Sequence, residues 1–221
     1  MFSGFDGSIL YTLDGDSAGD RFGLFVSGAG DVNGDGFDDL AVGAIFDDDG
    51  DRRGQDRGAV WVLFLDGVRE ITPDSFSLFR GILTGGGLSD LLASDDSWMT
   101  VLPGITLNQA ERQVQLIVVG TSPTETPNEL RFRVEAHAEI NNIGQWIELW
   151  NYDTNSYEQV DFMIATLVDS IVEVSITTNP ERFIQAGTKE MKAKVSYKEA
   201  GIVLSFPWLI SFDQTAWVIA P

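Results

Sequence analysis

Apolar and polar residues alternate along short stretches in the last two thirds of the chain. In residues 129–140 (ELRFRVEAHAEI) and 189–198 (KEMKAKVSYK), every second position is apolar and the intervening positions are mostly charged. Successive side chains of a strand point to opposite faces of a sheet, so this pattern predicts strands with one buried face. The predicted inward positions are Leu130, Phe132, Val134, Ala136, Ala138 and Ile140, and then Met191, Ala193, Val195 and Tyr197.

Other β-rich runs extend the same pattern to the whole chain. SILYTL, LFVSGAG, DLAVGAI and AVWVLFL in the first part, and VQLIVVG, SIVEVSIT and GIVLSFPWLISF in the second, are separated by Gly, Asp and Pro turn signals. Only residues 87–94 (GLSDLLAS) suggest a short helix. We expect an all-β chain in which residues 1–72 form one domain and residues 73–221 an antiparallel β-sandwich or jelly roll, with Pro73 ending a strand at the boundary.

Acidic side chains are crowded between the second and third predicted strands. Like charges at this density repel one another unless a cation lies among them. The stretch DVNGDGFDD places an oxygen ligand at every second position, and a glycine permits the sharp turn. Hard oxygen donors suit Ca²⁺ better than zinc or copper. The predicted metal ligands are Asp31, Asn33, Asp35, Phe37 through its backbone carbonyl, and Asp39.

Two kinds of calcium loop begin in this way. A helix–loop–helix hand requires a bidentate glutamate at position 12, which is Val42 here, and both flanks have strand patterns. A calcium loop in a β-hairpin therefore fits better, with a structural rather than catalytic ion. The other interpretation is a solvated acidic turn without an ion.

The segment around this loop carries further motifs in a fixed order. Phe22-Gly23 precedes the loop, Gly43-Ala44-Ile45 follows it, and GAVWVLF closes the segment at residues 58–64. Over about residues 4–67 the chain resembles an FG-GAP repeat, the blade unit of integrin-α-type β-propellers, although the proline of the GAP motif is missing. The resemblance implies the same five calcium ligands and an extracellular or cell-surface location.

A single blade raises the question of what covers its flanks. Propellers close with about four to eight blades, and one repeat cannot bury its own apolar faces. Three arrangements remain open: the chain is the tail of a longer protein, the blade packs on the C-terminal domain, or it packs on another subunit. The third arrangement predicts self-association into a homo-oligomer or filament.

Two tryptophans on one strand face are the clearest binding candidates in the second domain. In QWIELWNY, Trp146 and Trp150 share a face with Glu148, and Ile147 and Leu149 take the other. The pair either stacks on sugar rings or packs within the sandwich or at a subunit contact. Asn151, Tyr152 and Tyr157 in the next turn either add polar contacts or serve as turn residues. The order of motifs in this domain is similar to galactose-binding-like jelly rolls.

Composition narrows the functional classes. The net charge of −20 disfavours binding to nucleic acid, and no apolar run is long enough to span a membrane. Cysteine is absent, His137 is the only histidine, and Asp95 and Asp96 are adjacent rather than paired across a cleft, so no catalytic residues or organic cofactor are predicted. No secretion signal is visible. We therefore expect a non-enzymatic, calcium-stabilised extracellular adhesion or structural protein. The alternatives are a carbohydrate-binding module and, third, an accessory of a polysaccharide-active hydrolase.

Overall fold

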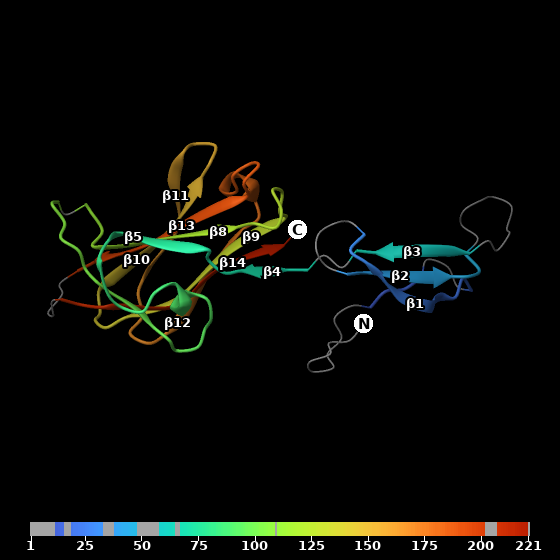
Figure 1. The fold of residues 1–221 in the computed structure, drawn as a ribbon, viewed down its shortest axis with the longest axis horizontal. Coiled ribbons are helices and arrows are strands. Elements are labelled where there is room, and N and C mark those ends of the chain that lie inside the picture. The colour runs from blue at the N-terminus through green and yellow to red at the C-terminus, as the bar shows by residue number, and fades with distance from the viewer. Residues whose placement is uncertain are drawn as a thin grey trace. The chain divides into compact units, whose positions relative to one another are not determined.

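The computed structural model describes residues 12–15, 19–32, 38–47, 58–64, 67–108, 110–201 and 207–220. The chain divides into two compact units, residues 1–67 and 68–221, and both are built of antiparallel strands (Figure 1). The division falls at 67/68 rather than at the expected 72/73. The reason is strand β4 (Arg69–Ile71), which pairs with the last strand of the second unit.

The first unit contains a three-stranded meander. Its strands are β1 (Phe22–Gly30), β2 (Asp39–Ala44) and β3 (Ala59–Leu63), in the order β1-β2-β3. These are the strands predicted after the FG motif, after the acidic loop and in GAVWVLF. Of the stretch predicted as a strand at 8–13, residues 8–11 lie outside the described residues, and 12 and 13 are not in a strand.

The second unit is a sandwich of two antiparallel sheets. The five-stranded sheet has the order β11-β10-β13-β8-β5 and the six-stranded sheet contains β12-β9-β14-β7-β6, with β4 also paired to β14. The all-β fold and the antiparallel sandwich predicted from the alternation are confirmed. The strands are β5 (Ser75–Arg80), β6 (Ile82–Gly85), β7 (Met99–Leu102), β8 (Val114–Thr121), β9 (Glu129–Ala138), β10 (Ile143–Asn151), β11 (Ser156–Ile164), β12 (Ser170–Ile176), β13 (Glu190–Glu199) and β14 (Ile210–Ala220).

The core lies between the two sheets and is made of the predicted inward positions. The alternate apolar residues of β9 and β13 are almost wholly buried, and only Ile140, just beyond β9, is partly exposed. Large rings fill the middle: Phe132 and Trp217 meet edge to face with centroids 5.3 Å apart. Gly120 in β8 makes room for this packing, because a β-carbon there would lie 2.8 Å from the Trp217 ring.

The predicted helix at 87–94 is a single 3-10 turn, η1 (Leu88–Leu91). The Asp90 carboxylate accepts a hydrogen bond from the Gly87 amide (2.7 Å) at its start, and Leu92 forms a bridge to Gln214 at its end. The turn is short because the chain must return to the sheet there. The other helical turn is η2 (Pro180–Phe183). No helix among the described residues is long and apolar enough to cross a membrane.

Candidate functional site

The predicted calcium loop lies between β1 and β2, and its two ends are described. Asp39 is fully buried at the start of β2, and its Oδ2 accepts a hydrogen bond from the Val32 amide (2.8 Å). Asp31 is exposed. The other three predicted ligands, Asn33, Asp35 and Phe37, lie outside the described residues. The Asp39 carboxylate therefore faces back across the turn toward its beginning, and calcium ligation by the five residues stays a prediction.

The outward face of the five-stranded sheet gathers the aromatic residues of β10 and β11. Strand register pairs Trp146 with Phe162 and Trp150 with Tyr157, so that all four rings lie on one face. Trp146 and Phe162 are 4.8 Å apart between centroids, and Trp150 meets Tyr157 edge to face at 5.0 Å. Their neighbours Ile147 and Leu149 are buried in the core, as the alternation predicted.

An ion network joins the two aromatic pairs. Glu148, between the tryptophans, forms salt bridges with Arg112 and, at 3.0 Å, with Lys194 of the neighbouring strand β13. The Arg112 guanidinium lies 4.8 Å from the Trp146 ring centre, and the Lys194 ammonium lies 4.0 Å from that of Tyr157. These contacts form a continuous row of rings and charged groups, called here the ring-and-ion row. Its members, in order, are Phe162, Trp146, Arg112, Glu148, Lys194, Tyr157 and Trp150. Each side chain in the row restricts the rotation of the next.

The outward rings are partly sheltered by this packing. Trp146 and Trp150 are half-buried, whereas Phe162 is 48% exposed. Burial and, to a lesser degree, the charge of Glu148 raise the pKa of Tyr157 to about 12, so its hydroxyl stays protonated at neutral pH. Gly144 lies beneath Trp146, since a β-carbon there would come within 2.6 Å of the indole.

The polar candidates in the turn after β10 divide into two groups. Tyr157 belongs to the ring-and-ion row. The Asn151 Oδ1 accepts hydrogen bonds from the amides of Asp153 (2.9 Å) and Thr154 (3.2 Å), which makes Asn151 a turn residue. The Tyr152 hydroxyl donates to Glu190 (3.0 Å). Neither Asn151 nor Tyr152 is part of the ring-and-ion row.

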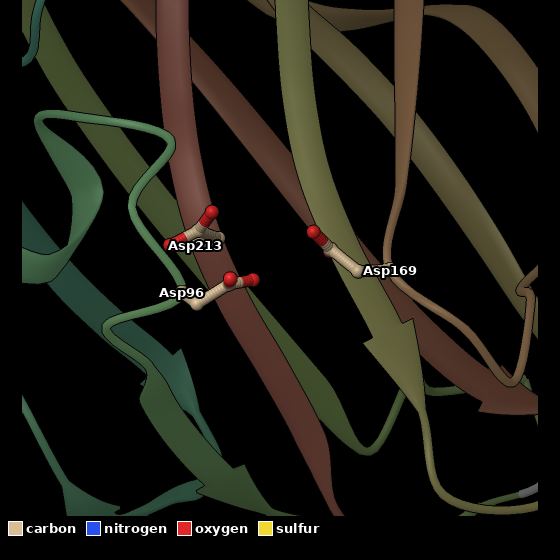
Figure 2. A group of neighbouring side chains, drawn as sticks. All are labelled: Asp96, Asp169 and Asp213. Carbon is tan, nitrogen blue, oxygen red and sulfur yellow. The ribbon is translucent and has the colours of Figure 1, made fainter.

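A second group of carboxylates lies on the outward face of the six-stranded sheet. Asp96 precedes β7, Asp169 precedes β12 and Asp213 is within β14, and one oxygen of each lies within 4.8 Å of the other two. Figure 2 shows the three side chains reaching toward one another from separate segments. Asp213 is the extra residue of a β-bulge, because the register of β14 against β9 shifts between Phe212 and Gln214.

Glu135 of β9 joins these aspartates. It is 7% exposed although the alternation of β9 turns it outward, and it interacts electrostatically with Asp169 and Asp96 and acts on Asp213. Burial and the neighbouring Asp169 raise the pKa of Glu135, against a hydrogen bond from Ser94 that lowers it. The pKa of Asp213 is raised by burial, and the amides of Asp96 and Asp95 lower it.

Further along the same strand, carboxylates meet arginines instead. Arg133 bridges Glu173 (2.8 Å) and Glu70 (2.9 Å), and Arg131 bridges Glu129 (2.8 Å). The hydrogen bonds from Arg131 and Ser175 lower the pKa of Glu129 to about 2. The outward face of β9 therefore changes from carboxylates paired with arginines at one end to Glu135, near the three aspartates, and His137 at the other.

The sequence pattern predicted some of the residues that lie on these two faces. It placed Trp146, Glu148 and Trp150 on one face and His137 on the polar face of β9, where its ring meets Trp98 edge to face at 4.8 Å. It did not find the side chains that complete each group, because no spacing motif connects them. Those are Arg112 and Lys194 on the first face, and Glu135, Asp169 and Asp213 on the second.

Several solved structures are similar to this chain over about two thirds of its length. They include a CBM4 structure (10% identity, 67% of this chain and 88% of that one, TM-score 0.41) and a carbohydrate-binding module of family 29 (6%, 69% and 89%, 0.42). The CBM22-1–GH10 modules of a Clostridium thermocellum endo-1,4-beta-D-xylanase 10B also match (8%, 68% and 27%, 0.44). Similarity at this level identifies no ligand for this chain.

Comparison of the sequence with family models gives a match within the first unit. No curated protein matches the chain. The family model of the FG-GAP repeat matches residues 22–63, which run from the FG motif through the acidic loop to the end of β3. The resemblance to an FG-GAP repeat, expected over about residues 4–67, is therefore confirmed over residues 22–63.

Proposed function

We propose that this chain is a non-enzymatic extracellular binding protein whose sandwich recognises a carbohydrate on the outward face of the five-stranded sheet. The observation that carries the proposal is the row of rings and charges on β10, β11, β13 and the segment before β8. It connects Phe162, Trp146, Arg112, Glu148, Lys194, Tyr157 and Trp150 through ring contacts, cation–π contacts and salt bridges.

A sugar ring has apolar C–H faces and a rim of hydroxyl groups. A matching surface needs flat aromatic area for the faces and a few fixed polar groups for the hydroxyls. Trp146 and Trp150 are two residues apart from a common central carboxylate, Glu148, so rings and polar groups alternate along the strand. Glu148 accepts hydrogen bonds, whereas Arg112 and Lys194 only donate them. The row therefore offers both kinds of partner to hydroxyl groups.

The contacts within the row favour binding because they fix it before a ligand arrives. A side chain that is already held loses less rotational freedom on binding, which preserves affinity. Lys194 is held against both Glu148 and the Tyr157 ring, and Arg112 against both Glu148 and the Trp146 ring. We interpret the half-burial of the tryptophans as part of this support.

The test is affinity electrophoresis of the full chain through gels that contain neutral or acidic polysaccharides. The wild type should be retarded by at least one polysaccharide. Trp150→Ala should weaken the retardation by about tenfold or more, as expected for the loss of an aromatic ring that contacts the ligand. The matched control is Ile171→Ala, which removes a 55% exposed apolar side chain from β12 on the other sheet. Equal retardation of Trp150→Ala and wild type would contradict the proposal.

The proposal includes Ca²⁺ bound in the FG-GAP blade. Support comes from the DVNGDGFDD spacing and from the buried Asp39, whose carboxylate reaches back to Val32 at the start of the loop. The ion would hold the β1–β2 hairpin, because it neutralises side chains that otherwise repel one another. Asp35→Asn should reduce the number of calcium ions bound per chain by one.

Self-association through the blade is a second candidate function. Within the described residues, β1 to β3 expose apolar side chains on both faces of the meander: Phe25 and Val60 line a hollow on one face, and Val26 a hollow on the other. Val60 is 73% exposed. Sedimentation velocity should show oligomers that Val60→Asp dissociates. A wild type that stays monomeric across concentrations would remove this candidate.

A further inference from the structure

The carboxylates around the β14 bulge come from four neighbouring strands of the six-stranded sheet. In the order β12-β9-β14-β7, Asp169 precedes the first strand, Glu135 lies on the second, Asp213 on the third, and Asp96 precedes the fourth. The bulge at Asp213 lies opposite Glu135 and Ala136. Two strands and the segments that lead into two others thus bring one carboxylate each to a single place, and Asp213 lies at a bulge.

The cluster has buried oxygen atoms that lack a hydrogen-bond partner. Glu135 is 7% exposed, and its Oε2 is buried without a partner, as is the Oδ1 of Asp169. A carboxylate oxygen removed from water without a hydrogen bond is costly. Because Glu135 interacts with Asp169, Asp96 and Asp213, its unpartnered oxygen belongs to the same group. The two side chains are close enough to hydrogen-bond when one of them is protonated, and a cation that contacts both would take the place of that proton.

Basic side chains do not neutralise the group. In the part of the chain that the structure describes, no lysine, arginine or histidine forms an ion pair with these four carboxylates. The arginines on the same strand, Arg131 and Arg133, are bound to Glu129, Glu173 and Glu70. A cation from solution would supply the missing charge.

The chemistry of the donors selects the cation. All four side chains offer oxygen, which suits hard divalent ions rather than zinc or copper. Mg²⁺ prefers to keep several waters and to use one or two carboxylates, whereas Ca²⁺ accepts many protein oxygens in irregular geometry. We propose that Asp96, Asp169 and Asp213, supported by Glu135, form a second Ca²⁺ site in the sandwich, separate from the loop of the FG-GAP blade. The ion would tie the segments before β7 and β12 to the centre of β14.

Calorimetric titration of the full chain with CaCl₂ tests this site. The reference is Asp35→Asn, which removes a predicted ligand of the blade loop. Adding Asp169→Asn or Asp96→Asn should remove one bound ion or weaken its binding by about tenfold or more. Asp96 is exposed and Asp169 half-buried, so both replacements should fold. The matched control, Glu173→Gln, removes a carboxylate of the same sheet that arginine already neutralises, and calcium binding should not change.

Thermal unfolding supplies an independent readout. At a calcium concentration of 100 times Kd, the melting temperature of the sandwich should rise by about 5–10 °C. Asp169→Asn should abolish this rise, and should raise the melting temperature of the calcium-free protein because it relieves repulsion. Calcium binding that is unchanged by both Asp169→Asn and Asp96→Asn, or absent at millimolar calcium, would overturn the proposal. Loss of polysaccharide binding is a different result and leaves this test unaffected.

Discussion

Each outward face of the sandwich carries a glutamate, but the side chains around the two glutamates have opposite charges. On the five-stranded sheet, Glu148 lies between Arg112 and Lys194, and rings cover both cations. On the six-stranded sheet, Glu135 lies among aspartates, and the nearby arginines serve other partners. The difference shows that the neighbours across strands, rather than the acid itself, decide what a carboxylate does. We therefore propose an organic ligand for the first face and a cation for the second.

The largest expected effect is the loss of the central carboxylate on the five-stranded face. Glu148→Ala leaves Arg112 and Lys194 without their anion, and we expect it to lower the free energy of unfolding by about 3 kcal/mol. Urea denaturation followed by tryptophan fluorescence measures this change. Glu173→Ala on the other face, where the salt bridges are more exposed, should cost about 1 kcal/mol or less. Equal losses of unfolding free energy in the two variants would contradict the difference between the two faces.

The two faces should also act independently of each other. Trp150→Ala should weaken polysaccharide binding by about tenfold and leave calcium binding unchanged, and Asp169→Asn should do the reverse. Affinity electrophoresis measures polysaccharide binding and calorimetry measures calcium binding, both on the same preparations. If either variant impairs both activities while its unfolding transition is normal, the two faces are coupled, which would contradict the prediction.

Glu135→Gln should have a smaller effect whose sign depends on calcium. Without calcium the change removes one negative charge from a crowded group, and we expect the free energy of unfolding to rise by about 1 kcal/mol. With saturating calcium the same change should be destabilising, because the ion loses an anionic neighbour. Chemical denaturation in chelator and in millimolar calcium measures the two signs. The same sign in both conditions would argue against an ion beside Glu135.

The smallest effect concerns pH and the arginine-paired end of β9. The pKa of Glu129 is lowered to about 2, so its ionised form stabilises the folded state. This contribution is complete above its ordinary pKa of about 4.5 and is lost as the pH falls toward 2. The stability difference between wild type and Glu129→Gln should therefore be constant at pH 6 and above and shrink toward pH 2. A difference that does not change with pH would contradict the assignment.

Local pattern predicted those parts of the molecule that depend on neighbours in sequence. The FG-GAP segment could be identified because its motifs follow one another within residues 22–63. The inward faces of β9 and β13, and the shared face of Trp146 and Trp150, follow from the two-residue repeat of a strand. The expected helix at 87–94 was reduced to the single turn η1 because Leu92 must pair with β14.

The contacts between side chains of different strands depend on strand order. The alternation of apolar and polar residues does not encode that order. Lys194 meets Glu148 because β13 lies beside β10. Asp96, Glu135, Asp169 and Asp213 are far apart in sequence and follow no spacing, and Asp213 depends on a bulge whose position no turn signal marks. Such groups become visible only when the order and register of the strands are known.

The most direct test of the account is the response of the tryptophan indole N–H signals to a polysaccharide that retards the full chain. We predict that the signals of Trp146 and Trp150 shift in proportion to the bound fraction, while that of Trp217, fully enclosed between the sheets, does not. Shifts confined to other tryptophans, or no shift at saturating polysaccharide, would contradict recognition by the outward face of the five-stranded sheet.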